Sequence, residues 1–94
     1  MGIWKTIKAT FGTSTLPEAR RLSAVNELAL SASIRALAVG ERGWITLSEA
    51  RALFGEMDRV GKASLAAFAG EREHRSTPEF VPAEGRVFFT RKAT

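Results

Sequence analysis

Residues 43–55, GWITLSEARALFG, lie near the middle of the 94-residue chain, and two local structures fit them. Gly43 and Glu49 have the spacing of the glycine and the last acid in a calcium-binding EF-hand loop. The same letters fit a short β-strand at Trp44-Ile45 that leads into a helix. Thr46 and Glu49 then form a capping box, in which each side chain bonds the other residue's backbone N–H. The first interpretation predicts a metal site, and the second predicts a strand and a helix.

The calcium interpretation fails because the ligands are missing. An EF-hand loop needs oxygen ligands at positions one, three and five, glycine at six and an acid at twelve. With Gly43 at position six, the first three ligand positions carry no carboxylate: Ala38, Gly40 and Arg42. With Gly61 at position six, Ala67 stands where the acid should be. We therefore favour the strand and capped helix, and expect no metal.

Two helices are predicted on the C-terminal side of this strand. Apolar residues of the first recur at helical spacing, and Gly55 is a plausible end: Leu47, Ala50, Leu53 and Phe54. The next helix is expected from Asp58, a good N-cap, to about Glu73. One side of it carries four residues: Leu65, Phe68, Ala69 and Arg72. Gly61 and Gly70 are expected to weaken it.

A longer helix is predicted on the N-terminal side. Thr15 and Glu18 form a second capping box around Pro17, and the helix is expected to run to about Val39, before Gly40. Its apolar residues cover a broad arc: Leu22, Val25, Ala29, Leu30, Ile34, Ala36, Leu37 and Val39. A helix with so wide an apolar arc is expected to pack on more than one side.

A β-hairpin is predicted at the C-terminal end. Phe80-Val81 and residues 86–90, RVFFT, are strand-like, and Pro82-Ala83-Glu84-Gly85 between them has the composition of a turn. The Trp44-Ile45 strand is expected to pair with Val87–Phe89. Together these elements predict an α+β fold.

Composition narrows the class of protein. Hydrophobic residues make up 45% of a chain long enough for one small domain, and no cysteine is present for disulfides or thiolate metal sites. No apolar run is long enough to span a membrane, and no secretory signal is evident, so we expect a cytoplasmic protein. The formal charge is +4 and the pI is near 10.4, which favours acidic partners such as nucleic acid. The excess positive charge lies towards the two ends of the chain.

The order helix, strand, helix, helix, hairpin resembles the winged helix–turn–helix superfamily. The resemblance covers residues 16–92, after an N-terminal amphipathic segment and loop at residues 1–15. It implies three main helices with a short strand and a hairpin wing, and a third helix that enters the DNA major groove. Five cations would then contact DNA: Arg59 and Lys62 on that helix, and Arg86, Arg91 and Lys92 on and after the wing.

Two other functions stay open. The third helix also carries Ala63, Ala66 and Gly70, which cannot hydrogen-bond base edges and instead allow close packing against a protein partner or a second subunit. The apolar side of the first segment provides a further contact for a partner or, less favourably, a membrane surface: Ile3, Trp4, Ile7 and Phe11.

No catalytic set can be assembled from the sequence. His74 is the only histidine, and it has no recognisable serine partner or metal-ligand spacing with Glu71 and Glu73. We interpret it as part of a polar helix end. We therefore expect a non-enzymatic binding domain without a cofactor.

Overall fold

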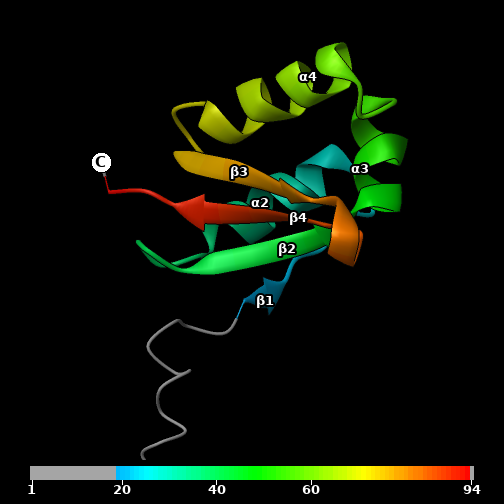
Figure 1. The fold of residues 1–94 in the computed structure, drawn as a ribbon. Coiled ribbons are helices and arrows are strands. Elements are labelled where there is room, and N and C mark those ends of the chain that lie inside the picture. The colour runs from blue at the N-terminus through cyan, green and yellow to red at the C-terminus, as the bar shows by residue number, and fades with distance from the viewer. Residues whose placement is uncertain (1–18, 94) are drawn as a thin grey trace, which may run out of the picture.

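The computed structural model of the protein describes residues 19–93 and shows an α+β architecture (Figure 1). These residues form three α-helices, a four-stranded mixed sheet and a short 3₁₀ helix. In chain order the elements are β1 (Arg20–Arg21), α2 (Glu27–Arg35), β2 (Arg42–Thr46), α3 (Leu47–Phe54), α4 (Arg59–Gly70), β3 (Ser76–Val81), η1 (Pro82–Glu84) and β4 (Arg86–Arg91). No helix within residues 19–93 is long and apolar enough to cross a membrane.

The sheet has the strand order β1-β2-β4-β3. β1 runs parallel to β2, whereas the other two pairings are antiparallel. Ile45 lies opposite Val87, and Gly43 lies opposite Phe89. The predicted pairing of the Trp44-Ile45 strand with the Val87–Phe89 strand is therefore confirmed.

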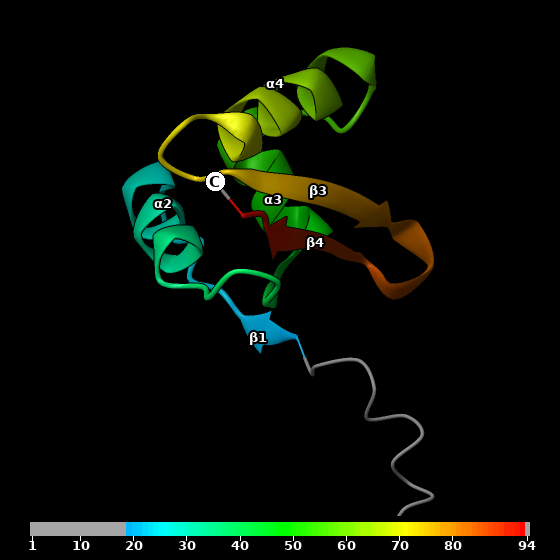
Figure 2. The same cartoon turned by 90° about the vertical axis from the view of Figure 1, so that its left-hand side faces the viewer.

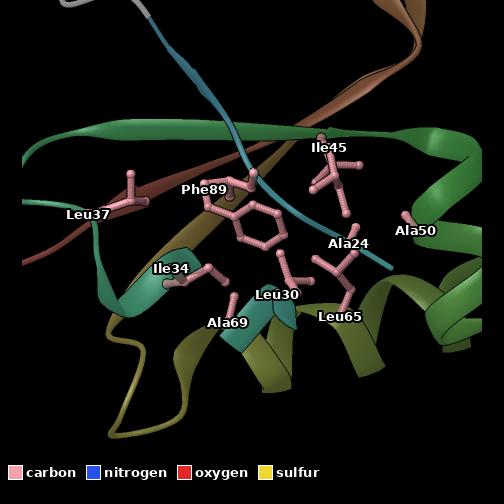
Figure 3. Packing of buried hydrophobic residues seen from close by; sticks show 11 residues of the cluster. Ala24, Leu30, Ile34, Leu37, Ile45, Ala50, Leu65, Ala69 and Phe89 are labelled. Atoms are coloured by element: carbon pink, nitrogen blue, oxygen red, sulfur yellow. The ribbon is translucent and has the colours of Figure 1, made fainter. Parts of the chain in front are cut away.

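The core lies between one face of the sheet and the helices (Figure 3). Strand residues alternate between faces, so Ile45 and Val87 point into the core, while Trp44 lies on the outer face. The Phe89 ring occupies the centre of the cluster (Figure 3). Side chains from α2 and α4 close the core from the other side: Leu30, Ile34, Leu65 and Ala69.

The predicted long N-terminal helix is wrong over much of its length. Its expected start at Thr15 lies outside the described residues. Arg20 and Arg21 form a strand instead, and the Leu22 N–H donates to the Trp44 carbonyl oxygen at 2.9 Å. The helix begins only after Asn26, whose side chain accepts the Ala29 N–H at 2.8 Å. Hydrogen bonds to a distant strand outweigh local helical spacing here.

The C-terminal part of that prediction is also wrong. α2 ends at Arg35, and Gly40 lies in a turn with φ +85°. Val25 and Val39, which were expected on the apolar face of the helix, lie outside it and are exposed.

The capping box that begins α3 is confirmed. The Thr46 hydroxyl accepts the Glu49 N–H at 3.1 Å, and the Glu49 carboxylate accepts the Thr46 N–H at 2.9 Å. Gly55 ends the helix with φ +87°, a conformation that favours glycine.

The start of α4 is confirmed and its end is corrected. The Asp58 carboxylate accepts the Gly61 N–H at 3.0 Å, as an N-cap does. The helix ends at Gly70 rather than Glu73, so Arg72 lies beyond it and is exposed. A Cβ at Gly61 would overlap the Glu56 carbonyl oxygen, so the fold requires glycine at this position. The close approach of the turn to α4 therefore depends on this glycine.

The C-terminal hairpin is confirmed, with strands longer than predicted. β3 and β4 pair over their whole lengths, from Ser76 opposite Arg91 to Val81 opposite Arg86. Gly85 closes the turn with φ +67°.

Candidate nucleic-acid interface

A short turn joins α3 to α4, and it brings two exposed helix segments together. Four residues connect the helices, beginning with Gly55 and ending with the cap Asp58. The ring centroids of Phe54 and Phe68 lie 5.3 Å apart, which fixes the two helices against each other. Figure 1 and Figure 2 show the start of α4 on the same side of the molecule as the turn between β3 and β4, but set apart from it above the sheet.

Arg59 and Lys62 lie on the first turn of α4, and both are exposed. The Lys62 ammonium lies 5.5 Å from the centroid of the Phe80 ring, which places it beside the hairpin end of β3. Arg51, in the last turn of α3, is exposed as well. Within residues 19–93, none of the three cations forms an ion pair with a carboxylate. Their charges are therefore available to an external anion.

Arg51 was missed by the sequence interpretation. The apolar face of α3 was recognised from Leu47, Ala50 and Leu53, and Arg51 lies away from it. The signal was thus present in the helical spacing.

The hairpin cations do not lie together. Arg86 starts β4 beside the turn, where its guanidinium stacks 4.0 Å from the Trp44 ring centroid and lies 4.0 Å from the Glu84 carboxylate. Arg91 lies at the other end of β4, a strand of about 20 Å. Its guanidinium turns to α2 and donates to the Ile34 carbonyl oxygen at 2.9 Å.

Arg86 stacks on Trp44 and so lies on the outer face of the sheet, whereas Lys62 lies beside Phe80, which packs against the core on the other face. Arg86 therefore does not join Arg59 and Lys62.

Lys92 lies with Arg91 at the far end of β4. Its backbone N–H donates to the Arg75 carbonyl oxygen at 2.7 Å, and its side chain is exposed. The five predicted DNA contacts therefore do not form one surface.

The outer face of the sheet carries a second group of cations, which sequence reasoning also missed. The Arg21 guanidinium, from β1, lies 4.8 Å from the centroid of the Trp44 ring, and the Arg42 guanidinium lies 4.3 Å from the centroid of the Phe88 ring. Together with Arg86 they place three guanidinium groups on two aromatic rings. The alternation of Arg42 with Trp44 and of Arg86 with Phe88 is the signal that could have shown this face.

Carboxylates neutralise this outer face. Arg21 donates two hydrogen bonds to Glu49, at 2.8 and 2.7 Å, and Arg42 pairs with Glu79 at 3.5 Å. Phe88 is only 7% exposed although it points away from the core, because neighbouring side chains cover it. The outer face is therefore closed by its own ion pairs and is a poorer anion site than the start of α4.

Glu49 combines two structural contacts. Burial raises the pKa of Glu49, but the Arg21 hydrogen bonds, the Thr46 N–H and the Arg21 charge outweigh burial. The net effect holds the pKa of Glu49 below its ordinary value of 4.5. One carboxylate thus caps α3 and ties β1 to it.

His74 is buried, so its interpretation as part of a polar helix end is wrong. It is 1% exposed, and both ring nitrogens are hydrogen-bonded. Nδ1 lies 2.6 Å from the Phe68 carbonyl oxygen and Nε2 lies 2.7 Å from the Ser31 hydroxyl. Since a carbonyl only accepts, Nδ1 carries a proton, and in the neutral imidazole Nε2 then accepts from the Ser31 hydroxyl. The ring also packs on Phe68, with centroids 4.4 Å apart.

The surroundings of His74 resemble two kinds of reactive site. Ligand atoms of Glu71, Glu73 and His74 lie within 4.8 Å of one another, but a metal ion would have to break a hydrogen bond of the imidazole. Ser31, His74 and Glu71 could also be compared with a catalytic triad, in which a serine nucleophile contacts a histidine base and a carboxylate lies beside the histidine. However, the Phe68 carbonyl takes Nδ1, with Glu71 at 3.7 Å, and the described residues enclose no pocket. The geometry is that of a cross-link between α2 and the α4–β3 connection.

Comparisons of the chain with models of known protein families, with curated proteins and with solved structures find no match. Several exposed cations within residues 19–93 form no ion pair with a carboxylate. Arg51, Arg59 and Lys62 lie around the α3–α4 turn, and Arg35, Arg72 and Lys92 lie elsewhere.

Proposed function

We propose that the chain is a winged helix–turn–helix domain that binds the backbone of double-stranded nucleic acid. The order of α2, β2, α3, α4 and the β3–β4 hairpin supports the assignment, as does β4 lying between β2 and β3 in the sheet. Two helices joined by a turn of three or four residues, often with glycine, are typical of a helix–turn–helix. The turn at Gly55 has this form.

The observation that carries the proposal is the exposed, unpaired state of Arg59 and Lys62 at the start of α4. With its 12 residues, α4 is about 18 Å long, and a helix fits the major groove of B-form DNA. Arg59 and Lys62 would contact phosphates, with Arg51 beside them. Arg86 is left out of the proposed contact, because it stacks on Trp44 on the outer face of the sheet and lies 4.0 Å from the Glu84 carboxylate. Arg91 is removed from the predicted interface, since it holds α2.

Binding is proposed to be independent of base sequence. The exposed residues of α4 include Ala63, Ala66 and Gly70, which offer no side-chain group to a base edge. Phosphate contacts position a protein on the duplex without reading sequence. Affinity should then fall with salt, with a logarithmic slope of about −2 to −4 for a few neutralised phosphates.

Fluorescence anisotropy with a labelled duplex of about 20 base pairs tests the proposal. The variant Arg59→Gln/Lys62→Gln should bind about tenfold more weakly than wild type. The slope of log affinity against log salt concentration should become less steep by about two. The variant Arg35→Gln/Arg72→Gln removes the same charge from exposed positions elsewhere and should bind nearly as wild type. Absence of binding at low salt, or equal losses in both variants, would reject the proposal.

A protein-interaction or homodimer function is the second candidate, and Val60 favours it. Val60 is 73% exposed on α4, three and seven residues before the exposed Ala63 and Ala67. Sedimentation equilibrium at tens of micromolar would show a dimer that Val60→Glu dissociates. A strict monomer would count against homodimerisation.

Membrane association through residues 1–11 remains a prediction, because those residues lie outside the described part of the chain. Flotation with anionic vesicles tests it. Wild type would float, and Trp4→Glu would not, if this segment inserts into the membrane interface.

A further inference from the structure

Helix α2 carries apolar residues on both of its sides. Leu30 and Ile34 are fully buried and point into the core (Figure 3). On the opposite side, Leu28 is 77% exposed and Ala32, one turn later, is exposed too. Glu27 and Arg35 are exposed on the same helix, so its outward side is mixed and not wholly apolar. The broad apolar arc seen in the sequence therefore has a packed half and an open half.

Two further exposed apolar side chains lie next to the helix in the chain. Val25, just before the helix, is 80% exposed, and Val39, just after it, is 67% exposed. We call Val25, Leu28, Ala32 and Val39 the α2 stripe. Among residues 19–93 it holds three of the four exposed large hydrophobic side chains. Single exposed hydrophobic residues are ordinary, but these three fall within residues 25–39, on and beside one helix.

We propose that the α2 stripe is the docking site for the apolar side chains of residues 3–11 of the same chain. Ile3, Trp4, Ile7 and Phe11 recur at helical spacing, so the sequence predicts that they would share one side of a helix, with two aromatic rings among them. The α2 stripe offers an apolar surface of similar form. Burial of both would remove from water two surfaces that are unfavourable when exposed.

The chain can make this contact without a partner. The Ser23 N–H donates to the Ser33 hydroxyl oxygen at 3.1 Å, so the chain lies against α2 only four residues after Ala19. Residues 12–18 add a connection that spans up to about 25 Å when extended. A short tether gives an effective concentration of the order of millimolar, which favours the attached segment over a second copy at micromolar protein.

Cysteine cross-linking in the full-length protein tests the proposal, because the chain has no cysteine of its own. Ile3→Cys, Ile7→Cys and Phe11→Cys are each combined with Leu28→Cys and oxidised at low micromolar concentration. The matched control combines the same three changes with Ala66→Cys, an exposed position on α4. At least one Leu28 pair should form an intramolecular disulfide at least tenfold faster than its Ala66 counterpart.

Equal rates for the Leu28 and Ala66 pairs would overturn the proposal, because they would show that the segment does not prefer α2. Cross-links found only between molecules would also overturn it and would assign the stripe to a second copy. A second readout is the emission of Trp4 in a Trp44→Phe background. Leu28→Glu should shift that emission to longer wavelength, and no shift would contradict docking. Neither outcome depends on nucleic-acid binding.

Discussion

Single residues set the geometry of the connection between α3 and α4. Gly61 lies in the first turn of α4, where a side chain would meet the Glu56 carbonyl oxygen. The α3–α4 turn can therefore pack directly against the backbone of α4. Gly70, at the other end of the same helix, has open space around its Cα. The two glycines look equivalent in the sequence, since both simply lower helix propensity. The two positions differ only because the backbone of the turn before α4 lies against Gly61.

Gly61→Ala should destabilise the protein by about 3 kcal/mol or more, because the new methyl group overlaps backbone that cannot move away cheaply. Gly70→Ala should be neutral or stabilise by up to about 1 kcal/mol, since it lowers the entropy of the unfolded chain. Urea denaturation measures both. Similar stabilities for the two variants would contradict the close contact at Gly61.

Glu49 predicts a specific response to acid. Its pKa is lowered in the folded protein, so its ionised form stabilises the fold. That contribution is complete above the ordinary value of 4.5 and is lost as the pH falls below it through the folded-state pKa. Glu49→Gln keeps a residue suited to the capping box but removes the charge beside Arg21.

The free energy of unfolding of wild type should therefore decrease more than that of Glu49→Gln between about pH 6 and pH 3. Glu73→Gln, at an exposed carboxylate, should follow the wild-type curve. Parallel curves for wild type and Glu49→Gln would show that the Arg21 contact adds nothing.

At the scale of elements, local signals located α3, the start of α4 and the hairpin correctly. Caps and turns act within a few residues. The capping box of Thr46 and Glu49 and the N-cap Asp58 could therefore be recognised from the sequence as helix starts. The long helix prediction failed because β1 depends on β2, more than 20 residues away. Of the candidate site, Arg59 and Lys62 could be placed from helical position, whereas the inward turn of Arg91 depends on where α2 packs.

α2 is fixed partly by a polar contact that the sequence could not show. Ser31→Ala removes the donor to His74 and leaves a buried imidazole nitrogen without a partner. We expect a loss of about 1–3 kcal/mol in the free energy of unfolding. Ser48→Ala, on the exposed side of α3, should change stability by no more than about 0.5 kcal/mol. Equal effects would mean that the Ser31–His74 contact does not fasten α2.

For the whole molecule, the position of the positive charge matters more than its total. On the outer sheet face, arginines stack on aromatic rings and pair with glutamates, whereas Arg59 and Lys62 at the start of α4 have no carboxylate partner among residues 19–93. The sequence showed a net excess of four charges but not which cations were already paired. Pairing is a property of the fold, because Arg21 and Glu49 meet only when β1 joins the sheet.

The most direct test of this account is an NMR titration of the ¹⁵N-labelled protein with a short duplex at low salt. Shift changes are expected at the backbone amides of Arg59, Val60 and Lys62, with a smaller change at Phe80, beside Lys62. They should be the same for duplexes of unrelated sequence and should disappear as salt rises. Changes centred on Leu28 and Val39 of the α2 stripe, or no changes at all, would contradict nucleic-acid binding through the start of α4.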